Sequence, residues 1–491
     1  MAETPAELEA RLAQKYRQPK AVEQFGVEVI PDELRTVRWW DIFTIVLNFL
    51  VNPGTITISG LLISSGMSLW EATLAGILSV LVGFSAYLVA ATVGSDYAIP
   101  GLVSMRSVFG VRGATVTSAL RAVSSVYWFA FQTVAAATGI AVVLEALLHS
   151  KVDVLWISVG CAILQLTVSI YGYNALMKLS RFAFIFKIVF SAVIVYLLMT
   201  FPHDGFAPHQ ALTFGGANVD KTSLIIFWMI AWGTSWFSNF TDAADFCRYT
   251  RRRSEMWIGT ISAAIVGQLI CSFIGGYAVA AVRGEAPEGP LGVIVESTRG
   301  VGWLLALVLA YIVLDAWIIN VQNLYTAGLA LTSMFKNLGR FWGTLIVGIL
   351  GTALSTSQHL ISGFDGAMGQ LGNLFAPMAG VFIAHYVIAS RWRIDVPALF
   401  RGEGSRYWYW NGVNWLALAS VAVGVPVNAM VPQVYANIII SALTSGLLYL
   451  AAVALLRRRV PVLAAALDSL APREELVPSP GPASFRVPDH H

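Results

Sequence analysis

Residues 48–54 read Asn48-Phe49-Leu50-Val51-Asn52-Pro53-Gly54 and interrupt the first long apolar segment of the chain, residues 39–63. Pro53 has no backbone N–H and Gly54 accepts dihedral angles that other residues avoid, so together they break a helix. Backbone groups freed inside a bilayer find no water, and such breaks are therefore tolerated only around protein-lined or wet cavities. The run predicts a broken membrane helix beside a cavity.

A second interruption lies in the segment 222–246, where Trp232-Gly233-Thr234-Ser235-Trp236 places small and hydroxylated residues between two tryptophans. For either break alone, a kink filled by neighbouring side chains is the alternative. The two segments are five helices apart, and this odd offset reverses the direction of the second copy. That pattern is typical of inverted repeats whose broken helices flank a substrate site near the midplane. We predict repeat one over about 39–201 and repeat two over about 222–389.

The composition places the chain in a bilayer. Its 491 residues are 57% hydrophobic and 12% charged with a mean hydropathy of +0.69, whereas soluble domains contain about 25% charged residues. Apolar runs recur that are long enough to cross a hydrocarbon core of about 30 Å. The twelve predicted spans are 39–63, 70–93, 114–147, 153–172, 182–201, 222–246, 256–282, 302–332, 341–357, 364–389, 408–430 and 433–456. The predicted fold is an all-α polytopic membrane protein, with a transporter domain over 39–456 in which helices 11 and 12 (408–456) follow the five-plus-five repeat.

Lysine and arginine mark the cytoplasmic loops, because translocating them is costly. Alternate loops carry Arg106 and Arg112; Lys178 and Arg181; Arg248 and Arg251 to Arg253; Lys336 and Arg340; and Arg391, Arg393, Arg401 and Arg406. Both tails, 1–38 and 457–491, are therefore predicted to be cytoplasmic, in an inner or plasma membrane. The first tail lacks a signal-peptide pattern, and the end of the second, Leu470–His491, has the composition of a disordered segment. The net charge of +3 reflects this topology and does not indicate a nucleic-acid partner.

Aromatic and amide side chains within the predicted spans suit a flat ring with amide edges. Trp128 and Gln132 share one face of helix 3, and Asn320 and Asn323 share one face of helix 8. Tryptophan covers the face of a ring, and Gln and Asn each offer a donor and an acceptor to a lactam or ureide edge. With Trp236 of helix 6, these residues are predicted to bind substrate. The alternative is that the tryptophans pack and the amides join helices, at about 1 kcal/mol each.

Charged side chains deep in a span cost a few kcal/mol unless they are paired or hydrated, so they indicate function by default. Asp315 lies in helix 8, with no cation nearby in the sequence. Arg121 in helix 3 and Asp242 and Asp245 in helix 6 are the others. Because Asp245 lies close to Arg248 near the end of its span, we interpret it as a structural ion pair or helix cap.

Four motifs, in order along about 39–454, resemble those of the nucleobase:cation symporter family, which includes cytosine, uracil, allantoin and hydantoin transporters. Residues 105–113 are similar to its Arg-x-x-Phe-Gly-x-Arg-Gly pattern, and residues 128–132 to its helix 3 signature. Asp245-Phe246-Cys247-Arg248-Tyr249 resembles its Asp-Phe-x-Arg-Tyr, and residues 410–415 resemble its Gly-x-Asn-Trp. The resemblance implies a five-plus-five inverted repeat that works by alternating access.

The resemblance also implies roles for individual residues. Trp128 and Trp236 match a pair that stacks on substrate, and Gln132 matches a glutamine that contacts the ring. Asn323 matches a helix 8 asparagine with a shift of one residue. Asn52 falls where the family often places a polar residue in the helix 1 break, and we include it among the predicted substrate-binding residues. The implied function is a symporter for a nucleobase or a related planar heterocycle such as cytosine, uracil, allantoin or hydantoin.

The chain departs from the family at the implied ion site. In sodium-coupled members, two adjacent hydroxyl residues of helix 8 and backbone carbonyls of helix 1 hold the ion. Ile318 and Ile319 stand at the hydroxyl positions and offer no oxygen to a hard cation. A proton on the nearby Asp315 could replace the bound cation. We predict ion coupling at Asp315 and Asn48, with H+ or Na+ as the coupling ion and the proton favoured.

A second departure adds another titratable candidate, since His385-Tyr386 replaces the family's Asp-Tyr at the end of helix 10. Within transport, the alternative substrate is an amino acid or a hydroxymethylpyrimidine-like compound. No nucleophile elbow, phosphate loop or metal motif is present in the sequence, so we expect no enzyme activity and no cofactor. The three cysteines, Cys161, Cys247 and Cys271, lack metal-site spacing and are interpreted as packing residues. The predicted partners are a heterocyclic substrate, a coupling cation and the lipid bilayer.

Overall fold

The computed structural model describes residues 4–148, 150–200, 207–287, 289–298, 301–335, 337–357, 359–362 and 364–467. The regular secondary structure of this part of the chain is helical, apart from two isolated bridges. The first repeat contains α2 (Trp39–Leu50), α3 (Pro53–Ser64), α4 (Leu69–Tyr97), α5 (Gly101–Phe109), α6 (Ala114–Leu148), α7 (Val154–Tyr171) and α8 (Tyr173–Thr200). The second contains α10 (Lys221–Phe237), η2 (Ser238–Thr241), α11 (Ala243–Cys247), α12 (Arg253–Cys271), η3 (Ser272–Gly276), α13 (Tyr277–Ala281), α14 (Gly289–Thr298), α15 (Gly302–Met334), α16 (Arg340–Leu354), α17 (His359–Ser362), α18 (Phe364–Ile383) and η4 (Ala384–Ala389). The remaining elements are α1 (Pro5–Lys15), η1 (Asp32–Leu34), α9 (Pro208–Ala211), α19 (Val396–Phe400), α20 (Trp415–Met430), η5 (Gln433–Tyr435), α21 (Asn437–Leu456) and α22 (Pro461–Leu467).

Each of the twelve predicted membrane spans corresponds to a helical segment of the structure. Within the described residues, eight helical segments are long and apolar enough to cross a membrane, and the bent pair α2–α3 makes a ninth. The shorter apolar helices α16 and α20, with the segment α10–α11, account for the other three predicted spans. Two starts differ from the prediction: α8 begins at Tyr173 instead of near residue 182, and α20 begins at Trp415 instead of near 408.

The predicted break in the first span is confirmed. The axes of α2 and α3 differ by 56°. Asn52 is extended and caps α3, since its Oδ1 accepts a hydrogen bond from the Thr55 amide at 2.9 Å. Pro53 occupies the first position of α3, where a missing N–H leaves no intrahelical hydrogen bond unmade. The covalent structure of residues 52–54 therefore accounts for the bend.

The break predicted at residues 232–236 is wrong by about one turn. α10 remains helical through Phe237, and the α-helix gives way to the 3-10 turn η2 only at Ser238. The Thr234 hydroxyl donates to the Ile230 carbonyl at 2.8 Å, so it is satisfied within the helix. The small residue Gly233 serves packing instead, because a Cβ there would lie 3.3 Å from the Ser79 carbonyl oxygen of α4.

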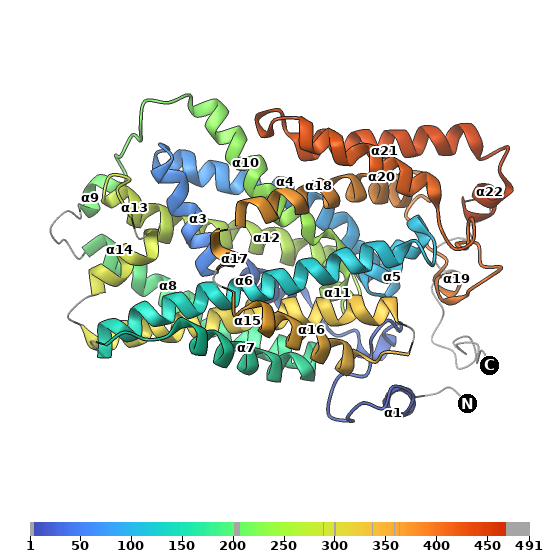
Figure 1. Cartoon of the computed structure of the whole chain (residues 1–491), viewed down its shortest axis with the longest axis horizontal. Helices are drawn as coiled ribbons and strands as arrows, with labels where there is room; N and C mark the ends of the chain where they lie inside the picture. Colours follow the sequence, from blue (N-terminus) through green and yellow to red (C-terminus); the bar gives the residue numbers. More distant parts are fainter. Residues whose placement is uncertain are drawn as a thin grey trace.

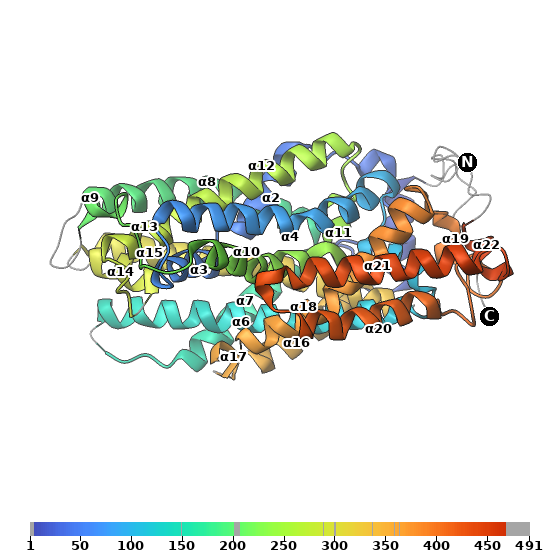
Figure 2. The same ribbon diagram turned by 90° about the horizontal axis from the view of Figure 1, so that it is seen from above.

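Helix packing follows the inverted repeat. The first and second spans of repeat one are α2–α3 and α4, and their counterparts in repeat two, spans six and seven, begin with α10 and α12. α2 packs on α12 and α10 packs on α4, so the two contacts are equivalent under the exchange of the repeats. Likewise α6 packs on α7 and α15 on α16, while α6 and α15 pack on each other. Figure 1 shows α6, α7, α15 and α16 in one layer and α18, α20 and α21 in the opposite one. Figure 2 shows α2 and α12 side by side along a third edge.

The segment predicted as an N-terminal tail is folded against the bundle. The Glu23 carboxylate accepts a hydrogen bond from Arg248 at 2.8 Å and lies 3.4 Å from Nε of Arg340. In the C-terminal tail, α22 buries Leu463 and Leu467, while the predicted disorder of 470–491 falls outside the described residues. Figure 1 shows α1 and α22 near the same end of the molecule as α5 and α19.

Candidate functional site

Gln132 of α6 faces the break between α2 and α3. A Cβ built on Gly54 would lie 3.9 Å from Gln132 Nε2, which places the amide beside the start of α3. Gln132 is 8% exposed, and its side chain makes no hydrogen bond to any residue that the structure describes. The amide therefore retains its hydrogen-bonding capacity beside the break.

Trp236 lies in the last turn of α10, next to the end of α2 that precedes the same break. Its ring centroid is 5.4 Å from that of Phe49 in α2 and 6.0 Å from that of Phe84 in α4. α4 fits closely here, because a Cβ on Gly83 would lie 2.3 Å from the Cβ of Trp236. The indole N–H is buried and finds no acceptor within the described part of the chain. A buried, unused donor in an aromatic setting is suited to a polar ring.

Trp128 lies one helical turn before Gln132 and is half-buried. It makes an edge-on contact with Phe131, with ring centroids 5.8 Å apart. α6, which carries Trp128, packs against both α3 and α15. The predicted shared face of Trp128 and Gln132 is thus part of a single continuous helix.

Asn320 occupies the centre of a hydrogen-bonded network between α6, α7 and α15. Its Nδ2 donates to Gln165 Oε1 at 2.8 Å and to Thr133 Oγ1 at 2.9 Å, with the Phe129 carbonyl at 3.2 Å. Its Oδ1 accepts from Nδ2 of Asn323 at 3.1 Å. Asn320 therefore joins helices and orients Asn323.

The Asn52 side chain is used by the break itself. Besides capping α3, its Nδ2 donates to the carbonyls of Phe49 at 2.9 Å and Leu50 at 3.3 Å. These contacts hold the end of α2 against the start of α3. A direct contact of Asn52 with substrate stays a prediction.

Asp315 of α15 forms an ion pair with Lys187 of α8, and both side chains are almost completely buried. Lys187 also donates to two backbone carbonyls at the end of α2, those of Asn48 at 3.1 Å and Val51 at 2.7 Å. The Asn48 side chain is engaged elsewhere, with Thr44 and Ser180 carbonyls. The backbone carbonyl of Asn48 and the carboxylate of Asp315 therefore bind the same ammonium group, that of Lys187.

Sequence reasoning missed Lys187, although a signal was available. The residue lies inside the predicted span 182–201, where an ionisable side chain is a functional candidate by default. The other missed contact is that of Cys271, whose Sγ lies 3.6 Å from the Leu50 carbonyl at the same break.

The other charged residues singled out in the sequence have partners other than Lys187 and Asp315. Arg121 bonds Asp242 at 2.5 Å, with both side chains buried, and reaches Asn239 at 3.3 Å. Asp245 accepts a hydrogen bond from the Gly101 amide at the start of α5 at 2.9 Å. Asp245 therefore takes a capping role, whereas Arg248 binds Glu23.

His385 lies in the π-helical turn η4, where its Nδ1 is 2.8 Å from the Tyr449 hydroxyl of α21. This places it at the packing of α18 against the appended helices. The three cysteines are free, and no cluster of metal-binding side chains occurs among the residues that the structure describes.

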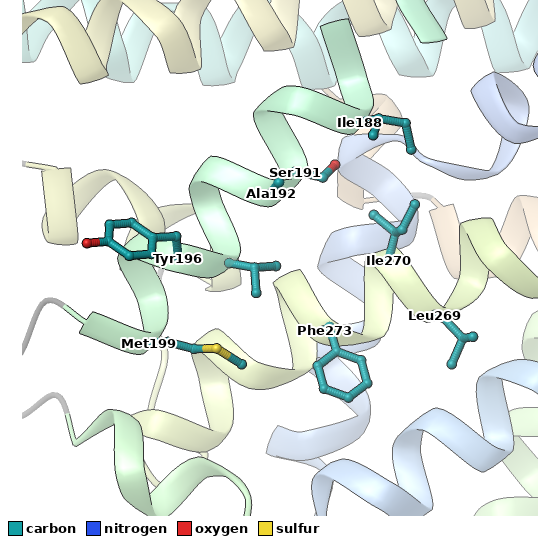
Figure 3. A pocket seen from close by; sticks show the side chains of 9 residues that line it. Ile188, Ser191, Ala192, Tyr196, Met199, Leu269, Ile270 and Phe273 are labelled. Carbon is teal, nitrogen blue, oxygen red and sulfur yellow. The ribbon is translucent and has the colours of Figure 1, made fainter. Parts of the chain in front are cut away.

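A groove of about 590 Å³ lies on the outside of the bundle, between α8 and the α12–η3 segment (Figure 3). Its walls are apolar and include the exposed Tyr196 and the side chain of Phe273. The groove is lined by Ile188, Ser191, Ala192, Val195, Tyr196, Met199, Leu269, Ile270 and Phe273. None of these is a predicted site residue.

Comparison with known proteins gives a consistent match over most of the chain. The sequence model of the family described as permease for cytosine/purines, uracil, thiamine and allantoin matches residues 29–451. The hydantoin permease of Microbacterium maritypicum is 28% identical over 356 residues, which cover 67% of this chain and 69% of that protein. The allantoin permease of Bacillus subtilis (strain 168) is 22% identical over 441 residues, covering 84% and 88%. The cytosine permease of Escherichia coli (strain K12) is 26% identical over 334 residues, covering 66% and 70%.

Solved structures match the fold. Mhp1, a nucleobase-cation-symport-1 family transporter in a closed conformation with bromovinylhydantoin bound, superposes with a TM-score of 0.76 at 22% identity, covering 92% of this chain and 99% of that one. The inward-facing conformation of Mhp1 gives 0.68 at 21% identity, covering 92% and 96%. These likenesses establish the inverted-repeat architecture for this chain.

Proposed function

Because the chain belongs to the permease family for cytosine/purines, uracil, thiamine and allantoin, a family of transporters and not of enzymes, we propose that it is a secondary active symporter for a planar heterocycle. The substrate is a nucleobase or a related ring such as cytosine, uracil, allantoin or hydantoin, imported by alternating access. The observation that carries this proposal is the amide of Gln132 beside the helix break, which makes no hydrogen bond to the residues that the structure describes.

We assign the faces of the ring to Trp128 and Trp236 and its edge to Gln132 and Asn323. Within the described part of the chain, the indole N–H of Trp236 and the amide of Gln132 have no hydrogen-bond partner and can bind the ring. Asn320 acts by orienting Asn323, and Asn52 by shaping the break that the ring meets. Relatives named for hydantoin, allantoin and cytosine, which are all small rings with amide-like edges, support this assignment.

We assign the coupling ion to the region of Asp315 and the Asn48 carbonyl. Ile318 and Ile319 are buried beside Asp315 and supply no oxygen ligand, which favours a proton over sodium. We place both termini in the cytoplasm, on the inner side of a cell membrane. The arginine-rich loops support this orientation. The terminal helices α1 and α22 also lie at one end of the molecule, the end that carries α5 and α19.

The test is a thermal-shift screen of the purified protein against nucleobases, hydantoins, allantoin, hydroxymethylpyrimidine and amino acids. A ligand present at about 100 times its Kd stabilises the protein by about 2.7 kcal/mol. We expect stabilisation by one of the planar ureide or lactam rings. Stabilisation by an amino acid or by hydroxymethylpyrimidine alone would refute the assigned substrate class and select the alternative.

A further inference from the structure

The break in helix 1 leaves four backbone carbonyls without their usual helical donors. α2 ends at Leu50, the chain is extended at Asn52, and Pro53 has no N–H to give. Carbonyls at a helix C-terminus carry partial negative charge and attract cations. In a bilayer each of them needs a partner.

The structure shows what those partners are. Asn52 Nδ2 binds the carbonyls of Phe49 and Leu50, and Cys271 also approaches that of Leu50. The two remaining carbonyls, of Asn48 and Val51, both accept from Nζ of Lys187. One ammonium thus serves the two carbonyls that no other side chain of the described residues reaches.

Asp315 completes the surroundings of this ammonium. Its two carboxylate oxygens make no hydrogen bond to other residues that the structure describes, so Lys187 is its partner. The other titratable groups that face the pair are Cys271 from α12 and Tyr311 from α15, whose ring stacks on Phe190 of α8. The oxygens of α2 and α15 therefore form a cation site that already contains a covalently attached cation.

We propose that Lys187 is a built-in cation that occupies the coupling-ion position, and that the Lys187–Asp315 pair binds and releases the transported proton. This inference rests on the proposed symport function and names its coupling device. Loss of one proton from the ammonium to water breaks an N–H bond and leaves a neutral amine beside a charged carboxylate. Rebinding of one proton restores the ammonium and its contacts.

The location of the pair gives proton binding a mechanical effect. Lys187 on α8 connects α2, which packs on α12, with α15, which packs on α6. A neutral amine attracts the α2 carbonyls and Asp315 much less strongly than an ammonium does. Deprotonation therefore loosens the end of α2 from α15, and protonation tightens it.

The experiment measures substrate accumulation in proteoliposomes under separately imposed proton and sodium gradients. Wild-type protein is expected to accumulate the heterocycle with an inward proton gradient and to ignore replacement of sodium by choline. A gradient of one pH unit drives about tenfold accumulation when one proton accompanies each substrate. Strict sodium dependence of the wild type would overturn the inference and leave heterocycle transport, measured in the same vesicles, standing.

The decisive variant is Lys187→Arg, because a guanidinium keeps the charge and does not release its proton in proteins. We expect this variant to bind heterocycle and to exchange labelled for unlabelled substrate. It should not show the accumulation of about tenfold that a gradient of one pH unit drives in the wild type. Lys178→Arg, an exposed lysine of the same helix, is the matched control and should behave as wild type. Proton-driven accumulation that persists in Lys187→Arg would refute the inference.

A second variant covers the case in which Lys187→Arg does not fold. Lys187→Met combined with Asp315→Asn removes both charges together and leaves no unpaired ion. It is expected to exchange substrate without dependence on pH, and retained pH-driven accumulation would again refute the pair's role. If neither wild type nor variants bind any planar ring, the proposed substrate class fails instead.

Discussion

Replacing Gln132 by Leu separates a substrate contact from a structural hydrogen bond. The two side chains are similar in size, and Gln132 makes no hydrogen bond to the described residues, so the substitution leaves no protein group unpaired. A bound ring, in contrast, loses the partner of its buried donor or acceptor. The usual cost of about 1–3 kcal/mol corresponds to a 5- to 150-fold weaker Kd.

Gln165 of α7 provides the matched control. Its Oε1 accepts hydrogen bonds from Asn320 at 2.8 Å and from Thr133 at 3.1 Å, so Gln165→Leu removes one acceptor that two buried donors share. We expect Gln165→Leu to lower the thermal stability in detergent while ligand affinity changes little. Gln132→Leu should do the reverse.

The assay is isothermal calorimetry with the ring selected by the thermal-shift screen, together with a melting curve for each ligand-free variant. An unchanged Kd for Gln132→Leu would show that the amide does not contact the substrate. A lower melting temperature of Gln132→Leu without ligand would show that the amide stabilises the helix packing, although it makes no hydrogen bond to the described residues.

Three further perturbations test other parts of the molecule. Trp128→Ala should abolish saturable uptake at unchanged membrane expression while Trp128→Phe retains part of it, and near-normal uptake by the alanine variant would remove this residue from the site. Asn52→Ala should destabilise the protein by about 1 kcal/mol through the lost cap of α3, measured by denaturation in detergent, and an unchanged melting curve would contradict the capping role. Glu23→Gln should cost about 3–5 kcal/mol because it leaves the buried Arg248 and Arg340 without their carboxylate, and a stability loss below 1 kcal/mol would show that the N-terminal segment is only loosely held.

The two helix breaks show which part of the fold local sequence determines. At Pro53 the missing N–H and the ring impose the bend whatever surrounds them, and the structure bends there. At Gly233 and Thr234 the sequence shows only small and hydroxylated residues. The Thr234 hydroxyl donates a hydrogen bond to the Ile230 carbonyl of the same helix, and Gly233 allows α4 to pack closely. The helix therefore continues through both residues. Small residues alone do not distinguish a break from a close helix contact.

The candidate site shows which functional contacts the sequence predicts and which it does not. Trp128 and Gln132 share a face because they are four residues apart on one helix, which the sequence alone predicts. The contacts of Asn320 depend on α6 and α7, which reach it from distant parts of the chain. Lys187 and Asp315 belong to different repeats, so only the folded arrangement of α8 and α15 identifies them as a pair.

The break in helix 1 gives the protein two helix ends of opposite polarity at one depth. The carbonyls that end α2 face Lys187, while the first turn of α3, at Gly54, lies beside Gln132. A C-terminal end attracts a cation and an N-terminal end attracts the carbonyl oxygen of a substrate. Because the extended link at Val51 and Asn52 joins these ends directly, a shift of α2 that follows proton release from Lys187 also moves the first turn of α3. Under the proposed mechanism, the same link therefore transmits the state of the coupling proton to the substrate site, with no longer chain of residues required.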